Sequence, residues 1–389
     1  MTMTNATVQP VFSPNPPDAA GVLTWVHIGD LHMTQRGEQN DLDLRAIIDE
    51  LNGAFADTVS FVYVPGDIAD DGSRSAYSVV RQSLDRLNLP WCAIVGDHDV
   101  HEKSFANFLE AMSGATQYAF SVGSTRFIAM NAFDIPDPGS FTVLPEQMRW
   151  VEQELKDATT ARQTKILLLH CYPSDLKTGG DQLAALVRKY QVRLIDMGHT
   201  HYNEIANDRH TIYTATRSTG QIEEGPVGFS ITNLDGGVLS WRFLELAELP
   251  AVVITSPADD RLTTDEGVSF DGKRKSITVR AKIWSRGKTQ HVRASIGGQE
   301  SVLQQVPGSA VWEGVVDTAG LVDGIHPLLV RTEDIEGRTA EDTIRLYIGK
   351  KPLHAIARSE KDQDNAMGAW PEHGLLGTQL GPNKNGRKW

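Results

Sequence analysis

Residues 23–246 repeat one pattern, in which an apolar, β-branched run ends in a polar residue and an amphipathic stretch follows. Residues 42–55, 75–87 and 145–158 are the amphipathic stretches, with apolar side chains at helical spacing. Alternating strands and helices predict an α/β domain. Because ligand sites in such folds gather at the carboxyl ends of strands, the ends of these runs are where a functional site is expected. The five runs read LTWVHIGD, SFVYVPGD, WCAIVGD, KILLLH and VRLIDMGH.

Each run delivers side chains that bind protons or metals. They are Asp30 and His32, Asp67, then Asp97, His98 and Asp99, then His170, and finally His199 and His201. Taken singly, such an aspartate is more often a turn or cap residue, and such a histidine is more often a satisfied core residue. Carboxylates and imidazoles together suit zinc, iron or manganese. Their joint occurrence at five strand ends therefore predicts two metals that share one carboxylate, a clamp used for displacement at phosphorus.

Length and charge narrow the class of protein. A chain of 389 residues is longer than one compact core usually holds, which favours two domains. The net charge of -13 argues against binding to a nucleic acid polymer or a membrane surface, and no apolar run approaches the length of a membrane span. The beginning of the chain lacks the features of a secretory signal, and Cys92 and Cys171 are the two cysteines. We therefore expect a cytoplasmic protein.

Four segments are expected along the chain. Residues 1–21 are predicted to form a flexible leader, and 22–246 the α/β domain. Short alternating segments separated by turn residues then predict a small β-sandwich of the immunoglobulin or fibronectin type over 247–351. The extension 352–389 is rich in Gly, Pro and Asn but also carries apolar residues, so it is either disordered or packed on its own or a neighbouring chain. The sandwich and the extension offer surface for a homo-oligomer.

The strand-end residues match a known pattern. The chain has D-L-H at 30–32, G-D-I-A-D at 66–70, G-D-H-D at 96–99, His170, and G-H-T-H at 198–201. In these blocks it resembles the calcineurin-like metallophosphoesterase superfamily over about 23–246. The segments PGDIADDGSRSAY, LNLPWCAIVGDHD, LPEQMRWVEQEL and TATRSTGQ are similar to the class III cyclic-nucleotide phosphodiesterase and glycerophosphodiesterase branch. The resemblance implies a four-layer fold, with two facing β-sheets flanked by helices.

The resemblance also implies a role for each ligand-block residue. Asp67 would bridge two divalent or trivalent ions (Mn, Fe, Zn or Co), and His98 would lie beside the substrate phosphate with Asp99 orienting it. The remaining ligands divide between Asp30, His32 and His201 at the first metal and Asp97, His170 and His199 at the second. The implied reaction is hydrolysis of a small phosphodiester, of cyclic-nucleotide or glycerophosphodiester type, by a metal-bound hydroxide.

Asp97 departs from the family pattern, which places Asn there. Two divalent ions with two carboxylates and a neutral amide carry a charge of +2, and a third carboxylate lowers it to +1. That change disfavours a dianionic monoester more than a monoanionic diester. Three other interpretations stay open. The chain is a dimetal hydrolase of another bond or of monoesters, it is a non-catalytic scaffold, or the replacement of Asn by Asp has no consequence for the reaction.

Two further residues are candidates for substrate contact. His101 follows Asp99 by two positions and is expected to meet a phosphate oxygen, unless it caps the following helix. Arg217 lies just beyond a predicted strand, where it is expected to form either a surface salt bridge or a contact with the phosphate or with a neighbouring acidic residue.

Overall fold

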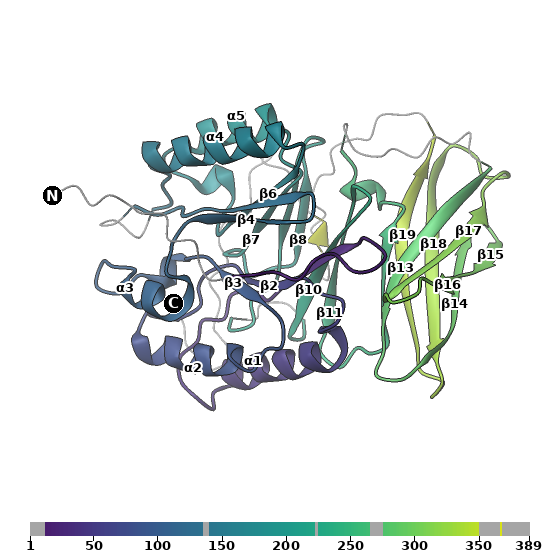
Figure 1. Ribbon diagram of the computed structural model, residues 1–389, viewed down its shortest axis with the longest axis horizontal. Helices are drawn as coiled ribbons and strands as arrows, with labels where there is room; N and C mark the ends of the chain where they lie inside the picture. Colours follow the sequence, from purple (N-terminus) through teal and green to yellow (C-terminus); the bar gives the residue numbers. More distant parts are fainter. Residues whose placement is uncertain (1–11, 135–139, 222–224, 265–274, 350–365, 368–389) are drawn as a thin grey trace.

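The computed structural model describes residues 12–134, 140–221, 225–264, 275–349 and 366–367. Two sheets face each other in its larger part (Figure 1). The first has the order β11-β10-β1-β2-β3, with β1, β2 and β3 parallel and β10 antiparallel to β1 and to β11. Its strands are β1 (Leu23–His27), β2 (Phe61–Val64), β3 (Trp91–Ala93), β10 (Gly228–Asp235) and β11 (Val238–Glu245).

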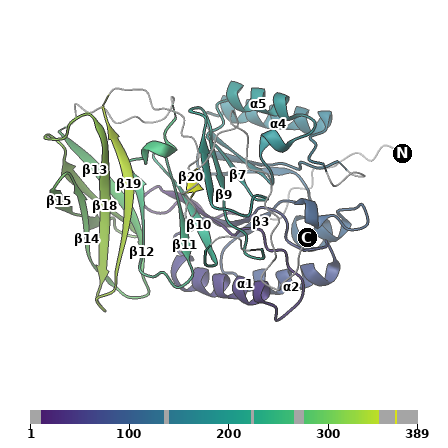
Figure 2. The ribbon, with the colours of Figure 1, turned by 180° about the vertical axis from the view of Figure 1, so that it is seen from behind.

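The second sheet has the order β20-β8-β9-β7-β6-β5-β4. Strands β5, β6, β7 and β9 run parallel, so their carboxyl ends share one edge. Its strands are β4 (Tyr118–Val122), β5 (Thr125–Ala129), β6 (Thr164–Leu169), β7 (Leu194–Met197), β8 (Glu204–Asn207), β9 (Ile212–Ala215) and β20 (Ala366–Met367). The last of these pairs with β8, and it is the part of the predicted extension that the structure describes (Figure 2).

Helices cover the outer face of each sheet, which confirms the four-layer fold. Within β1, Trp25 points between the sheets, 5.3 Å from the ring of Phe127 on β5, whereas Val26 packs with α1 and α2. This alternation follows from the two-residue period of a strand. The helices are α1 (Gln39–Glu50) and α2 (Arg74–Leu84) on the first sheet, and α4 (Pro145–Thr160) and α5 (Gly180–Lys189) on the second (Figure 1).

Short helical segments lie between these elements and, in one case, between the strands β12 (Ala251–Ser256) and β13 (Ser276–Trp284). Among the described residues, no helix is long and apolar enough to cross a membrane. The short segments are η1 (Leu51–Phe55), η2 (Asp97–Asp99), α3 (Ala106–Phe108), η3 (Leu109–Ser113), η4 (Pro173–Asp175) and η5 (Asp260–Leu262).

The remainder is the predicted β-sandwich, made of two four-stranded antiparallel sheets around an apolar core (Figure 2). One sheet has the order β12-β13-β17-β16, and the other has the order β15-β14-β18-β19. The strands are β12 (Ala251–Ser256), β13 (Ser276–Trp284), β14 (Thr289–Ile296), β15 (Gln299–Val302), β16 (Gln304–Gln305), β17 (Val311–Asp317), β18 (Gly324–Asp334) and β19 (Thr339–Ile348).

The sandwich is packed firmly onto the α/β part. Ala251, Val253 and Trp284 belong to the same apolar cluster as the residues beneath α1 and α2. Residues 12–21 also contribute: the Phe12 ring lies 4.8 Å from the ring of Phe120, and Asp18 forms an ion pair with a buried lysine of β13. Residues 12–21 thus make aromatic and ionic contacts with the rest of the chain, whereas residues 1–11 of the predicted leader lie outside the described residues.

Candidate metal centre

The predicted ligands lie at the carboxyl ends of the central parallel strands of both sheets. Asp30 and His32 follow β1, Asp67 follows β2, His170 follows β6, and the pair His199 and His201 follows β7. Because these strand ends meet at one edge of the layered structure, side chains that are far apart in sequence come together. The structure places all seven predicted ligands in two groups that share one carboxylate.

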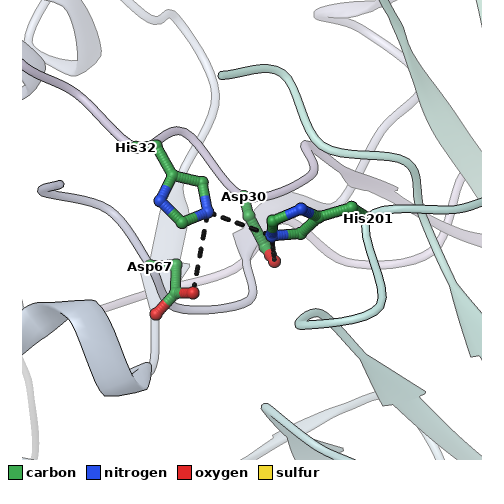
Figure 3. A group of neighbouring side chains, drawn as sticks. All are labelled: Asp30, His32, Asp67 and His201. Atoms are coloured by element: carbon green, nitrogen blue, oxygen red, sulfur yellow. Dashed lines mark hydrogen bonds and ion pairs between the residues drawn. The ribbon is translucent and has the colours of Figure 1, made fainter. Parts of the chain in front are cut away.

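The first group is Asp30, His32, Asp67 and His201, all buried, with ligand atoms within 4.8 Å of one another (Figure 3). The Nε2 atoms of His32 and His201 are 3.1 Å apart. The Nε2 of His32 lies 3.6 Å from Asp67 Oδ2, and that of His201 lies 3.7 Å from Asp30 Oδ2. Two imidazole nitrogens and two carboxylate oxygens thus converge on one point.

The second group is Asp67, Asp97, His170 and His199. Asp97 Oδ1 lies 3.2 Å from His170 Nε2 and 3.3 Å from His199 Nδ1. His170 Nε2 is also 3.4 Å from Asp67 Oδ1, whereas Asp67 Oδ2 faces the first group. One oxygen of Asp67 therefore points to each group, which is the arrangement of a bridging carboxylate.

Four of these residues have a left-handed backbone. The φ angles are 41° at His32, 47° at Asp67, 67° at His199 and 62° at His201. Such angles are unfavourable for residues with a Cβ, and they cluster at functional sites when the surrounding structure imposes them. Here they turn the chain sharply at the strand ends, so that neighbouring ligands reach the same point.

The donor set fits two metal ions. Asp30 Oδ1 is buried and has no hydrogen-bond partner among the described residues. The ring orientation of His170 is set by its Nδ1–H, which donates to the Pro65 carbonyl at 2.7 Å and leaves Nε2 facing the carboxylates. A partner of this kind on the far nitrogen is usual for metal-binding histidines. Three carboxylates and four imidazoles are hard and borderline ligands, suited to Mn, Fe, Zn or Co.

Charges within the second group confirm how strongly its members interact. Although burial alone would lower it, the carboxylates of Asp67 and Asp97 raise the pKa of His170 well above its ordinary value. Burial would raise the pKa of Asp97, but the imidazoles of His170 and His199 hold it well below its usual range. The carboxylates and the His170 imidazole thus favour each other's charged forms, and a metal ion would need the imidazole nitrogen in its deprotonated form.

Two histidines stand at the open side of the site. His98 Nδ1–H donates to the carbonyl of Asp70 at 2.9 Å, and His101 Nδ1–H donates to the carbonyl of Asp71 at 3.0 Å. The side chain of His98 is 17% exposed and that of Asp97 is 30% exposed, whereas the first group is sealed. Solvent therefore reaches the site at Asp97 and His98.

Asp99 lies buried between the turns that carry Asp67 and Asp97. Its carboxylate is fully buried and accepts hydrogen bonds from the backbone N–H of Gly96, Ile68 and Ala69 and from the Tyr77 hydroxyl. Burial, reinforced by the charge of Asp67, raises the pKa of Asp99 to about 7. Asp99 thus ties together the turns that carry Asp67 and Asp97, and the Asp70 carbonyl accepts a hydrogen bond from the His98 ring. That Asp99 orients His98 stays a prediction.

Arg217 packs against an aromatic ring and lies near an acidic residue, and its contact with the substrate stays a prediction. Its guanidinium is over the ring of Phe243, 3.9 Å from the ring centre, and its Nη2 is 3.9 Å from a carboxylate oxygen of Glu245. The acidic-neighbour alternative describes this position. The side chain is nevertheless buried, because the aromatic ring of β11 covers it.

Sequence reasoning missed Tyr77 and Phe141. The Tyr77 hydroxyl is 2.7 Å from Asp99 Oδ1, and the Phe141 ring packs edge-on against His199 with centroids 4.6 Å apart. A tyrosine on the apolar face of residues 75–87 was a detectable signal, since a buried hydroxyl needs a partner. Phe141 lies in an irregular loop, where periodicity carries no signal.

Comparisons with known proteins agree with this geometry. The family model described as calcineurin-like phosphoesterase matches residues 23–203. A probable cyclic nucleotide phosphodiesterase of Synechococcus sp. is 27% identical over 195 residues, which cover 46% of this chain and 69% of the relative. The 3',5'-cyclic adenosine monophosphate phosphodiesterase of Escherichia coli K12 is 24% identical over 258 residues, covering 63% and 81%.

A probable glycerophosphodiester phosphodiesterase of Arcobacter nitrofigilis is 24% identical over 195 residues, covering 45% of this chain and 71% of the relative. Among solved structures, a dimetal phosphatase of Danio rerio aligns with a TM-score of 0.49 and 15% identity, covering 57% of this chain and 97% of that one. The family match confirms the resemblance predicted from the ligand blocks. Residues 23–203 of this chain thus form a calcineurin-like phosphoesterase domain, and the family match together with the phosphodiesterase-named relatives supports a phosphoester hydrolase.

Proposed function

We propose that the substrate is a small phosphodiester, of cyclic-nucleotide or glycerophosphodiester type, hydrolysed at a dinuclear metal centre. The observation that carries this proposal is Asp67, whose two oxygens face two separate groups of ligands. Asp30, His32 and His201 would hold one ion, and Asp97, His170 and His199 the other. When bound, two such ions activate water and neutralise charge on the phosphoryl oxygens.

His98 is the residue of this chain best placed to act on the substrate. Its Nδ1–H is held by the Asp70 carbonyl, and its Nε2 lies at the exposed side of the site, 4.0 Å from Asp97 Oδ2. Although burial lowers it, the carboxylates of Asp67 and Asp97 raise the pKa of His98 above its ordinary value. A protonated Nε2 can bind a phosphoryl oxygen or protonate the leaving oxygen.

Asp97 supports a singly charged substrate. Its Oδ1 belongs to the second ligand group, while its Oδ2 remains on the exposed side that substrate must pass. A negative charge there repels a phosphomonoester dianion more than a phosphodiester monoanion. The same observation motivates the alternative, a dimetal hydrolase of another bond, because a third carboxylate weakens the Lewis acidity of both ions.

The test compares an aryl phosphodiester with the matching aryl phosphomonoester, on protein stripped by a chelator and refilled with Mn, Fe, Co or Zn. We expect no activity before refilling, a preference for the diester afterwards, and a severalfold shift toward the monoester in Asp97→Asn. Asp85→Asn, which removes one carboxylate charge at the end of α2 beside Arg81, is the matched control and should keep the wild-type preference.

Cleavage of neither ester by protein that binds two ions would refute the phosphodiesterase proposal and favour the alternative reaction. Absence of bound metal would refute both and favour the scaffold.

A further inference from the structure

A buried polar network joins the two sheets directly beneath the candidate metal centre. Asp196 on β7 places Oδ1 2.7 Å from Nδ1 of His27, and its Oδ2 accepts a hydrogen bond from Nε1 of Trp25 at 2.9 Å. His27 and Trp25 both lie on β1, in the opposite sheet. All three side chains have no exposed surface.

This network is costly in its surroundings. Apolar side chains such as Phe61, Phe127 and Ile166 pack between the sheets around it. A carboxylate can be buried there only because hydrogen bonds satisfy it, and an apolar side chain of similar size would often be as stable. The hydrogen bonds, unlike apolar contacts, are directional. They therefore specify how β1 lies against β7.

The imidazole of His27 has one hydrogen-bond partner among the described residues. Its Nδ1–H donates to Asp196, and its buried Nε2 has no hydrogen-bond partner within that part of the chain. A buried ring nitrogen without a partner is unfavourable. The His27 ring thus has an unfavourable nitrogen on one side, and its hydrogen bond on the other side crosses between the two sheets.

Both strands lead directly into the candidate metal centre. Asp30 follows His27 by three residues, and His199 follows Asp196 by three. The two strand ends also touch, since the backbone N–H of His199 donates to Asp30 Oδ2 at 2.7 Å. The first group takes Asp30 and His32 from the end of β1 and His201 from the end of β7. Its shape consequently depends on the separation of these two strands.

We propose that Asp196 is a positioning residue, whose hydrogen bonds to His27 and Trp25 hold the ends of β1 and β7 at the separation where Asp30, His32 and His201 meet. This inference rests on the proposed dinuclear centre. Asp196 touches none of the reacting groups, and it acts through the backbone of the two strands.

The test compares Asp196→Asn with Thr214→Val. In Asp196→Asn the amide N–H₂ cannot accept a hydrogen bond, and it reaches His27 only by donating to Nδ1 after the ring proton has moved to Nε2. The bonds to a charged carboxylate are therefore lost, and only weaker bonds between neutral groups remain between the sheets. Thr214 donates to the same Asp196 Oδ1 at 3.0 Å, but it lies on β9, beside β7 in the same sheet. Thr214→Val therefore removes one buried hydrogen bond of the same carboxylate and leaves the link between sheets in place.

Two readouts are needed. The first is hydrogen exchange of the His199 amide in metal-free protein, divided by the exchange of the β6 amides so that global opening cancels. The second is the dissociation constant of Mn²⁺, measured by calorimetry. Loss of a residue that helps to orient metal ligands typically weakens metal affinity about 10–100-fold. We expect Asp196→Asn to accelerate the relative exchange of the His199 amide and to raise the dissociation constant of the tighter Mn²⁺ site at least tenfold. Thr214→Val should leave both quantities unchanged.

Unchanged relative exchange in Asp196→Asn, or equal changes in both variants, would overturn the inference. If Asp196→Asn does not fold, Trp25→Phe removes one link and keeps an aromatic ring, and the same criteria apply to it. Wild-type protein that binds no Mn²⁺ would refute the proposed metal centre, while the exchange of the His199 amide would still decide whether Asp196 joins the two strand ends.

Discussion

At the scale of single residues, the shape of the site depends on buried groups that hold the ligand-bearing turns together. Asp99 is the clearest case, because one buried carboxylate accepts hydrogen bonds from both turns that carry metal-ligand candidates. The Tyr77 hydroxyl supplies a further hydrogen bond from α2. A helix on the outer face of the sheet is thereby connected to the turn that presents Asp67.

Tyr77→Phe should lower both stability and activity. Loss of the 2.7 Å hydrogen bond costs about 1–2 kcal/mol, since a buried carboxylate oxygen loses a donor. We expect kcat for an aryl diester to fall severalfold because the turns at Asp67 and Asp97 loosen. Tyr118→Phe is the control: its hydroxyl donates to the Ala93 carbonyl on β3, and its loss should reduce stability alone. Equal kcat in the two variants would contradict the role of Tyr77. Urea unfolding and steady-state kinetics measure both quantities.

Gly66→Ala should disrupt the candidate metal centre. Gly66 has a φ of +107°, and an added Cβ would lie 2.6 Å from His170 Nδ1 and 2.6 Å from the Gly96 backbone nitrogen. Both the backbone strain and the clash oppose the change, so we expect a loss of about 2 kcal/mol or more. Metal binding by calorimetry should weaken with it. Gly53→Ala is the control, because a Cβ at Gly53 meets nothing within 4 Å and alanine favours helix. Normal metal binding in Gly66→Ala would refute this account.

At the scale of elements, ionic contacts hold the short segment η5, which lies between β12 and β13, against β19. Both oxygens of Asp260, in η5, lie 3.2 Å from the Arg345 guanidinium on β19. Burial, followed by repulsion from Asp259, nevertheless raises the pKa of Asp260 to about 6. The ion pair therefore does not fully compensate the loss of hydration.

This raised pKa predicts a pH-dependent difference in stability. The folded carboxyl is protonated below about pH 6, whereas in the unfolded chain it ionises near 3.8, so folding takes up a proton between these values. Raising the pH through this window removes stability from the wild type but not from Asp260→Asn. The Tm of the variant minus that of the wild type should therefore increase from pH 5 to pH 7. Asp317→Asn, at an exposed position of β17, is the control. A difference independent of pH would contradict the prediction.

Elements were more predictable from the sequence than their partners. The apolar runs before Asp30 and Asp67 predicted buried strands. A parallel strand that is covered on its two faces carries apolar side chains on each of them, so its sequence is apolar throughout. The ligand groups followed from the rule that parallel strands share an edge. The partner of Asp99 did not, since which turn a buried carboxylate reaches depends on packing in three dimensions. The metal-binding role of the seven residues stays a prediction, as do the segment boundaries and the substrate contact of His101.

At the scale of the whole molecule, the sandwich is part of one packed body. Lys282 of β13 is fully buried where the sandwich meets the α/β part, and its Nζ lies 2.7 Å from Asp18 Oδ2 and 2.6 Å from the Thr24 hydroxyl. Trp284 lies in the core beneath α1 and donates to the Thr58 hydroxyl at 2.7 Å. Composition gave no sign of this, because Lys282 reads as one more polar residue in an alternating strand.

Lys282→Met should therefore destabilise the whole chain. Removing one partner of a buried ion pair leaves the Asp18 carboxylate without its counter-charge, which costs about 3–5 kcal/mol. The double variant Lys282→Met with Asp18→Asn should lose less than the sum of the two single variants, because the second change removes the unpaired charge. Since the core is continuous, tryptophan fluorescence and far-UV circular dichroism should report one transition in urea in every variant. Two separate transitions would show that the sandwich folds independently of the α/β part. Strictly additive losses of stability would show that Lys282 and Asp18 do not couple the two parts.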